Sequence, residues 1–135
     1  MESIHYLLMK AHMRLNKRIM GRAGALGLTP GKPKILEFLR LFGESNQKAI
    51  AAYCEIEPAT VGNILLGMEK EGLIIRQNKD GNRRSLYVSL TEQGARLAAE
   101  VLDIMQTEEQ AAASGLTEEE KQELARLLEK VCERL

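Results

Sequence analysis

Three cationic residues cluster on a short polar segment, where they could bind phosphate groups. Lys79, Arg83 and Arg84 surround residues 80–82, whose sequence Asp-Gly-Asn favours a tight turn. Guanidinium groups at the tip of a hairpin can enter a minor groove or grip the backbone of a nucleic acid. The simpler alternative is a loop whose charges serve only solubility. We favour the binding role because of the segments that surround this loop.

A second set of residues has the types that read base edges. Asn can form two hydrogen bonds with adenine, Thr can bond a base or touch a thymine methyl group, and Gly lets the backbone come close. These types follow one another on a helix predicted over residues 58–71, and the alternative is a solvated helix face. The candidates for base contact are Ala59, Thr60, Gly62 and Asn63.

Gln47 and Lys48 begin the preceding predicted helix. Free backbone N–H groups and the helix dipole at such a start favour a phosphate. We therefore add both residues to the set that contacts nucleic acid, together with Arg76, which precedes the basic loop.

The segments that carry these residues have the spacing of two short helices joined by a tight turn. Buried positions in such a tandem must be small or apolar, and the chain meets this demand. The residues at these positions are Ile50, Ala51, Cys54, Ile56, Val61 and Ile64. The departure is Glu55 at the turn, where Gly is common. A helix predicted from residue 30 to about 41, with Thr29 as its N-cap, comes before the tandem, and a hairpin with strands near 73–76 and 85–90 follows it.

Two long amphipathic regions flank this module. Apolar residues recur at helical spacing from residue 4 to about 23, and again after Thr91 and after Thr117, which forms a capping box with Glu120. The stripe after Thr91 is wider than one small domain needs, so we expect the flanking helices to contact a second copy of the chain. The residues assigned to this contact are Ile4, Leu8, Leu124, Leu128, Val131 and Leu135.

The predicted fold is therefore mainly α, with about six helices and a two-stranded β-hairpin wing, in a single protomer of 135 residues. Residues 29–91 form a winged helix-turn-helix module that binds double-stranded DNA. Residues 1–28 and 92–135 supply the dimerisation helices of an intertwined two-fold homodimer, as the family resemblance described below implies.

The distribution of charge agrees with this division. The net charge is zero, but residues 1–90 carry 14 Lys and Arg against 8 Asp and Glu, whereas residues 91–135 carry 5 against 11. The charges therefore divide the chain into a basic part, expected to bind nucleic acid, and an acidic part, expected to serve as the scaffold. No segment approaches the roughly 20 apolar residues of a membrane span, and the start of the chain lacks a signal-peptide core. We therefore expect a soluble cytoplasmic protein with no membrane partner.

Other chemistry finds little support in the sequence. Without a nucleophile–base pairing, metal-ligand spacing or phosphate-cradling glycine loop, we expect no catalytic site, cofactor or metal. His5 and His12 lie two helical turns, about 10 Å, apart, which is too far to bind one metal unaided. Cys54 falls at a packing position, with a redox switch as the alternative. Cys132 could form an intersubunit disulfide, although a reducing cytoplasm favours the thiol.

Nearly the whole chain resembles the MarR family of transcriptional regulators. The matching segments are GLTPGKPKILEFL, QKAIAAYCEIEPATVGNILLGMEKEGLIIR and NRRSLYVSLTEQG. The spacing between Gly72, Arg76, Arg84 and Thr91 needs no insertion or deletion. The resemblance implies a homodimer that binds a pseudo-palindromic operator, with repression as the default outcome. It also implies a small phenolic, anionic or oxidant signal that acts at the junction between the dimer scaffold and the DNA-binding module.

The sequence departs from the family pattern at two places. The family usually has Asp two residues before the position of Arg84, where this chain has Asn82. The recognition helix has Gly62, Asn63 and Leu66-Gly67 where Ser, Arg and an Asp-Arg pair are frequent. The target sequence therefore cannot be transferred from relatives. The neutral total charge and the charge-poor helix also leave a protein-interaction scaffold without DNA binding as the alternative function.

Overall fold

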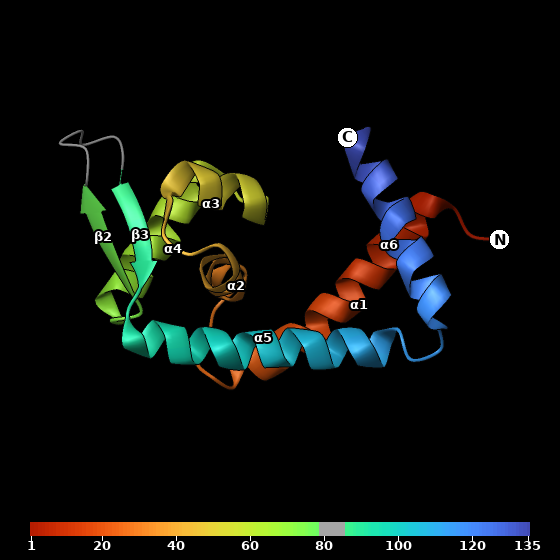
Figure 1. Cartoon of the computed structure of the whole chain (residues 1–135), viewed down its shortest axis with the longest axis horizontal. Coiled ribbons are helices and arrows are strands. Elements are labelled where there is room, and N and C mark those ends of the chain that lie inside the picture. The colour runs from red at the N-terminus through yellow and green to blue at the C-terminus, as the bar shows by residue number, and fades with distance from the viewer. Residues whose placement is uncertain (79–85) are drawn as a thin grey trace.

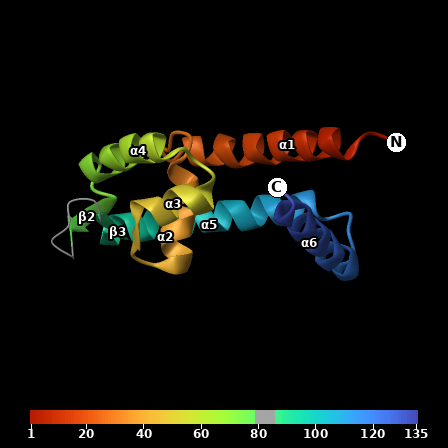
Figure 2. The same cartoon turned by 90° about the horizontal axis from the view of Figure 1, so that it is seen from above.

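Six helices and a small antiparallel sheet make up residues 1–78 and 86–135, the parts of the chain that the computed structural model describes. The order is α1 (Ile4–Gly24), α2 (Lys32–Phe42), β1 (Ser45–Asn46), α3 (Gln47–Cys54), α4 (Pro58–Lys70), β2 (Ile74–Asn78), β3 (Leu86–Leu90), α5 (Glu92–Ala112) and α6 (Glu118–Glu133). Helices α2 to α4 and the sheet form a module at one end, and α6 lies at the other end, near the first half of α1 and the end of α5 (Figures 1 and 2). The mainly α winged helix-turn-helix predicted from the sequence is confirmed.

An apolar core holds the module together. Ile35 and Leu36 of α2 meet Ile50 of α3, Leu65 of α4 and Val88 of β3, and all five side chains are fully buried. Burial of each such side chain contributes about 1.5 to 3 kcal/mol. The orientation of α4 relative to the sheet is therefore fixed by packing.

The start of α2 differs from the prediction. Thr29 and Pro30 were expected to cap and begin the helix, but α2 begins at Lys32 and its N-cap is Gly31, whose φ is 91°. A Cβ atom on Gly31 would lie 2.6 Å from the terminal methyl carbon of Ile64. Helix α4 therefore packs closely against the bare backbone at the N-cap of α2, a contact between distant segments that a local capping pattern does not contain.

Glu55 lies in the tight turn between α3 and α4, as the sequence predicts. Its φ of 54° and ψ of 46° put it in the left-handed region, which explains why Gly is common there. The N–H of Glu55 donates to the carbonyl of Ala51, and so does the N–H of Ile56. These bonds close the end of α3 and turn the chain into α4.

The sheet has three strands in the order β1-β3-β2, whereas a two-stranded hairpin was predicted. Ser45 pairs with Val88, and Ile74 pairs with Leu90, in antiparallel register. The additional strand β1 has only two residues, too few to show an alternating pattern, and its partner lies about forty residues further along the chain. The predicted basic tip with Lys79, Arg83 and Arg84 falls between β2 and β3, outside the described residues.

The terminal helices agree with their predicted starts. Ser3 caps α1 by accepting from the N–H of Tyr6. Thr117 and Glu120 form the predicted capping box of α6, with bonds of 2.9 and 3.1 Å. Among the described residues, no helix is both long enough and apolar enough to cross a membrane.

Candidate nucleic-acid interface

Helix α4 has one face in the core and one face in solvent. Val61, Leu65 and Met68 are 0% exposed, and they hold the helix against the module. The opposite face presents Ala59, Thr60 and Asn63, all exposed as the sequence predicted for base contact. Pro58 begins the helix, where its missing N–H costs no hydrogen bond. The polar groups on this face are therefore free to meet a ligand.

Gln47 lies beside α4 because Gly62 has no side chain. The Nε2 atom of Gln47 would be 3.1 Å from a Cβ atom on Gly62, so the amide occupies the space that any larger residue would fill. Asn46 fixes the start of α3 by accepting from the N–H of Ala49 at 2.8 Å. Lys48 follows on the exposed side. The two predicted contributors of α3 thus lie at its N-terminus, and Gln47 adjoins the exposed face of α4.

Arg76 forms an ion pair within the module. Its Nη2 atom lies 3.1 Å from Oε1 of Glu69, and its side chain is 18% exposed. The hydrogen bond and charge of Arg76 hold the pKa of the Glu69 carboxyl below its usual range. Because Glu69 belongs to α4 and Arg76 to β2, the pair links the helix to the hairpin. The sequence predicted Arg76 as a DNA contact and did not predict this partner.

A glycine joins the module to α5. A Cβ atom on Gly94 would lie 1.9 Å from the carbonyl oxygen of Leu73, so α5 begins in direct contact with the backbone before β2. Thr91 completes the joint. Its hydroxyl donates to the carbonyl of Gly72 at 2.6 Å and accepts from the N–H of Gly94 at 3.0 Å, and its own N–H donates to Leu73 at 3.0 Å. A displacement of α5 must therefore move the hairpin.

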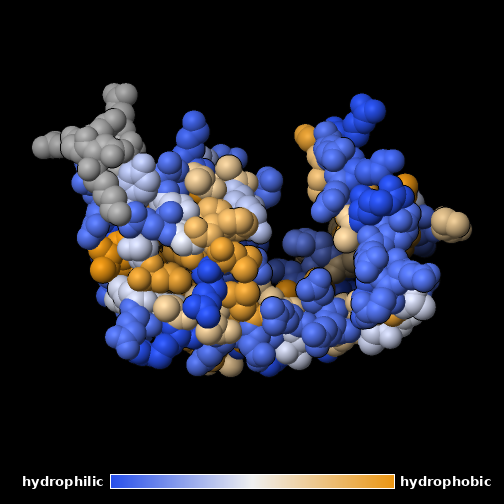
Figure 3. Space-filling model, viewed as in Figure 1, coloured by the Kyte–Doolittle hydropathy of each residue, from blue (hydrophilic) through white to orange (hydrophobic). Residues whose placement is uncertain are grey.

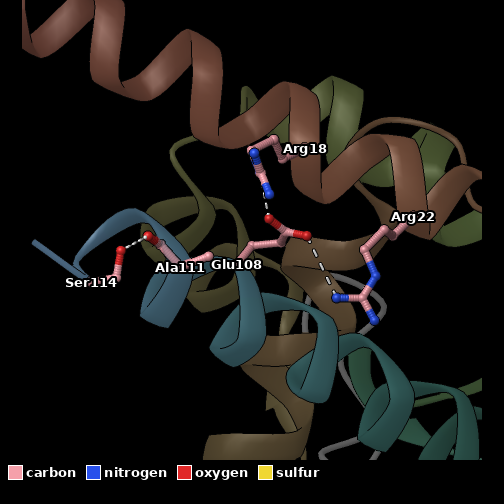
Figure 4. A network of polar contacts seen from close by, with 5 residues as sticks. All are labelled: Arg18, Arg22, Glu108, Ala111 and Ser114. Atoms are coloured by element: carbon pink, nitrogen blue, oxygen red, sulfur yellow. Dashed lines mark hydrogen bonds and ion pairs between the residues drawn. The ribbon is translucent and has the colours of Figure 1, made fainter.

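A buried carboxylate joins α1 to α5 (Figure 4). Nε of Arg18 lies 2.6 Å from Oε2 of Glu108, and Nη1 of Arg22 lies 3.6 Å from Oε1. The two guanidinium groups, Arg18 first, hold the pKa of the Glu108 carboxyl below its usual range. The charge of Glu108 is thus compensated where the two long helices meet.

The far ends of α1 and α6 expose many apolar side chains. No residue of α6 is buried, and Ile4 of α1 is 72% exposed. A groove of about 650 Å³ runs between the two helices, lined by apolar residues that include Leu8, Leu124 and Leu128. In the space-filling view, a hollow separates this end of the molecule from the module (Figure 3).

The structure places the six predicted dimerisation residues on these two helices and the end of the chain. Five are exposed and Val131 is half-buried. The sequence prediction omitted neighbours that share this exposed surface. They are Leu7, Met9, Met13 and Leu127.

Neither cysteine nor histidine forms a metal centre in the part of the chain that is described. Cys54 belongs to the core, as the packing interpretation predicted, and burial raises the pKa of its thiol. Cys132 is an exposed thiol near the end of α6. A buried thiol with a raised pKa is a poor nucleophile, so Cys54 acts as a small apolar residue.

Comparison with known proteins gives one consistent result. The family model described as MarR family matches residues 28–86. HTH-type transcriptional regulator MgrA of Staphylococcus aureus is 31% identical over 101 residues, which cover 73% of this chain and 67% of MgrA.

Two solved structures have the same fold over almost the whole chain. A putative MarR family transcriptional regulator from Listeria monocytogenes complexed with 26mer DNA matches with a TM-score of 0.92 at 23% identity, covering 99% of this chain and 89% of that one. NadR in complex with 4-hydroxyphenylacetate matches with a TM-score of 0.80 at 24% identity, covering 97% and 93%.

Proposed function

We propose that this chain, which belongs to the MarR family of transcriptional regulators, represses transcription as a homodimer bound to a pseudo-palindromic DNA operator. One observation carries the proposal. Helix α4 buries Val61, Leu65 and Met68 completely and presents Thr60 and Asn63 to solvent, and the β2–β3 hairpin follows it in the chain. A helix anchored in this way can enter a major groove while the hairpin reaches the neighbouring backbone.

Phosphate contacts would come from the residues around this helix. Lys48 and the N-terminus of α3 suit one phosphate, and the basic residues Lys79, Arg83 and Arg84, which lie between β2 and β3 in the sequence, suit others. Arg76, held by Glu69, would position the hairpin. Repression follows from occupancy, because a dimer across an operator covers DNA that the transcription machinery needs. Such a regulator would act in the cytoplasm, alongside the DNA it binds.

The second copy would cover the exposed apolar surface of α1 and α6. Contiguous apolar surface of this extent is typical of an interface. The groove between α1 and α6 has room for side chains of a partner helix, and its apolar lining suits them. Two-fold pairing through these helices would set two copies of α4 about one DNA turn apart, near 34 Å.

The DNA affinity would respond to a small-molecule signal. NadR, which has this fold, was solved in complex with 4-hydroxyphenylacetate, an anion with a phenolic ring. In this chain the junctions that a ligand could alter are the contact of Glu108 with Arg18 and the contact of Gly94 with Leu73. The exposed thiol of Cys132 is the candidate for an oxidant signal.

An aromatic cluster favours a second candidate function, that of a protein-interaction scaffold. Phe38, Phe42 and Tyr53 lie with ring centroids 5.0 to 5.1 Å apart, and Phe42 and Tyr53 are exposed. Apolar side chains gather over α2 and α3 in this region (Figure 3). Exposed aromatic residues are enriched at protein interfaces.

The experiment that tests the proposed function is a binding titration with duplex DNA selected by the protein from a randomised pool. Fluorescence anisotropy across a salt series should show affinity that falls steeply as salt rises, because phosphate contacts release counterions. Addition of small aromatic acids, or of an oxidant, should lower the affinity. Selection of no duplex, with capture of a protein partner instead, would favour the scaffold.

A separate experiment tests the dimer. The double variant Leu124→Glu and Leu128→Glu should sediment as a monomer, because it places charges in the apolar groove. Leu41→Glu on α2, where Leu41 is 54% exposed, is the matched control and should stay dimeric. A dimeric double variant would exclude this pairing surface.

A further inference from the structure

Leu66 is a large apolar residue of α4 that does not join the core. Val61, Leu65 and Met68 are 0% exposed, whereas Leu66 is 41% exposed. It lies on the same face as Asn63, three residues earlier, and Ala59, seven residues earlier. A single exposed leucine is ordinary on most surfaces. On the helix face that is proposed to contact bases, however, the apolar side chain of Leu66 limits which bases this face can bind.

The exposed surface of α4 carries no charge between Pro58 and Met68. Its exposed side chains are Ala59, Thr60, Asn63 and Leu66. The commonest contact with guanine needs Arg or Lys, and cytosine is read by carboxylates, so this surface lacks the groups that select G·C pairs. Asn63 can form two hydrogen bonds with adenine, and an apolar side chain suits the methyl group of thymine.

The spacing of the two residues matches the spacing of bases. Three residues along a helix correspond to a rise of about 4.5 Å, and successive bases are stacked about 3.4 Å apart. Gly67 follows Leu66 and carries no side chain to hold the helix away from the groove. A Cβ atom on Gly67 would meet only Glu71, at 3.9 Å. In a helix that lies along a major groove, this spacing would let Asn63 and Leu66 reach neighbouring base pairs.

We infer that Asn63 and Leu66 together read two adjacent A·T pairs in each half-site, with Asn63 bonded to adenine and Leu66 packed against a thymine methyl group. The inference rests on the proposed function, and it names the operator chemistry that the proposed function leaves open. Leu66 is then a specificity-determining residue that contributes nothing to the core.

The test removes a thymine methyl group from the DNA and, separately, the Leu66 side chain that is proposed to contact it. The probe is the duplex selected by the parent protein, in which each thymine of a half-site is replaced in turn by deoxyuridine. The parent should lose about fourfold in affinity at one thymine in each half-site, the equivalent of one buried methyl group. The Leu66→Ala variant should bind the thymine and deoxyuridine duplexes equally. Leu41→Ala, which removes an exposed leucine from α2, should behave as the parent does.

A second readout concerns Asn63. Replacement of the adjacent A·T pair by G·C should weaken the parent about 5- to 150-fold, and the Asn63→Ala variant should discriminate much less. Parent binding that is insensitive to every deoxyuridine substitution, or a Leu66→Ala variant with the same sensitivity as the parent, would overturn the inference and leave the proposed function intact. A parent protein without salt-sensitive binding to any duplex would overturn both.

Discussion

Replacement of Gly94 by Ala should separate the DNA-binding module from α5. A Cβ atom at this position would lie 1.9 Å from the carbonyl oxygen of Leu73 and 2.9 Å from its carbonyl carbon. Both atoms belong to the backbone, so no side chain can rotate away. Either α5 moves by more than an ångström or its first turn unwinds, and both changes break the bonds that Thr91 makes with Gly72 and Leu73.

The magnitude follows from the contacts that are lost. The cap and one backbone hydrogen bond contribute about 1 kcal/mol each, and overpacking costs about 1 to 3 kcal/mol. Ala gains about 1 kcal/mol over Gly in helix propensity. The free energy of unfolding should therefore fall by about 2 to 4 kcal/mol in urea denaturation at matched protein concentration.

Gly67→Ala is the matched control for this experiment. It lies inside α4, and a Cβ atom there meets only an ordinary contact with Glu71 at 3.9 Å. This variant should be as stable as the parent or up to about 1 kcal/mol more stable. If Gly94→Ala behaves in the same way, the proposed rigid joint between α5 and the hairpin is refuted.

Three further predictions concern contacts within the interface and scaffold. Gly62→Ala should displace the Gln47 amide, whose Nε2 would be 3.1 Å from the new Cβ atom. The affinity for DNA should fall about fivefold, while the melting temperature stays that of the parent. Unchanged affinity would contradict a role for Gln47 in DNA binding. The pKa of the Glu108 carboxyl is lowered in the folded protein, so its charge stabilises the fold above the ordinary carboxyl pKa of about 4.3. This stabilisation is lost as the pH falls through the lowered pKa of the folded protein. Glu108→Gln should therefore make the midpoint of denaturation depend less on pH in the acid range. Glu69→Gln should weaken the bond to Arg76 and lower DNA affinity while costing less than about 1 kcal/mol of stability, and an affinity equal to that of the parent would exclude Arg76 as the brace of the hairpin.

Local signals in the sequence predicted the elements whose causes are local. The Thr117–Glu120 capping box needs only four consecutive residues, and it is present as predicted. The tight turn at Glu55 was placed by the spacing of small residues on either side, and its left-handed backbone confirms it. The exposure of Thr60 and Asn63 followed from helical periodicity alone.

Contacts between distant segments could not be predicted in this way. The close contact at the N-cap of α2 involves Ile64, more than thirty residues beyond Gly31. Strand β1 exists because β3 pairs with it, and Glu108 is compensated by Arg18, 90 residues earlier. The sequence marks Leu66 only as a departure from the family pattern, because periodicity does not separate an exposed leucine from its buried neighbour Leu65. Each of these features is a consequence of tertiary packing.

The most direct test of a rigid dimer on DNA is the dependence of affinity on half-site spacing. Insertion of half a helical turn between the two half-sites of the selected duplex moves the second half-site to the opposite face of the DNA. The affinity should fall to that of a single half-site. A rigid dimer cannot span the longer distance, so insertion of a full turn should not restore the affinity of the parent duplex. Equal affinity for the parent duplex and the half-turn insertion would contradict two copies of α4 held in fixed register.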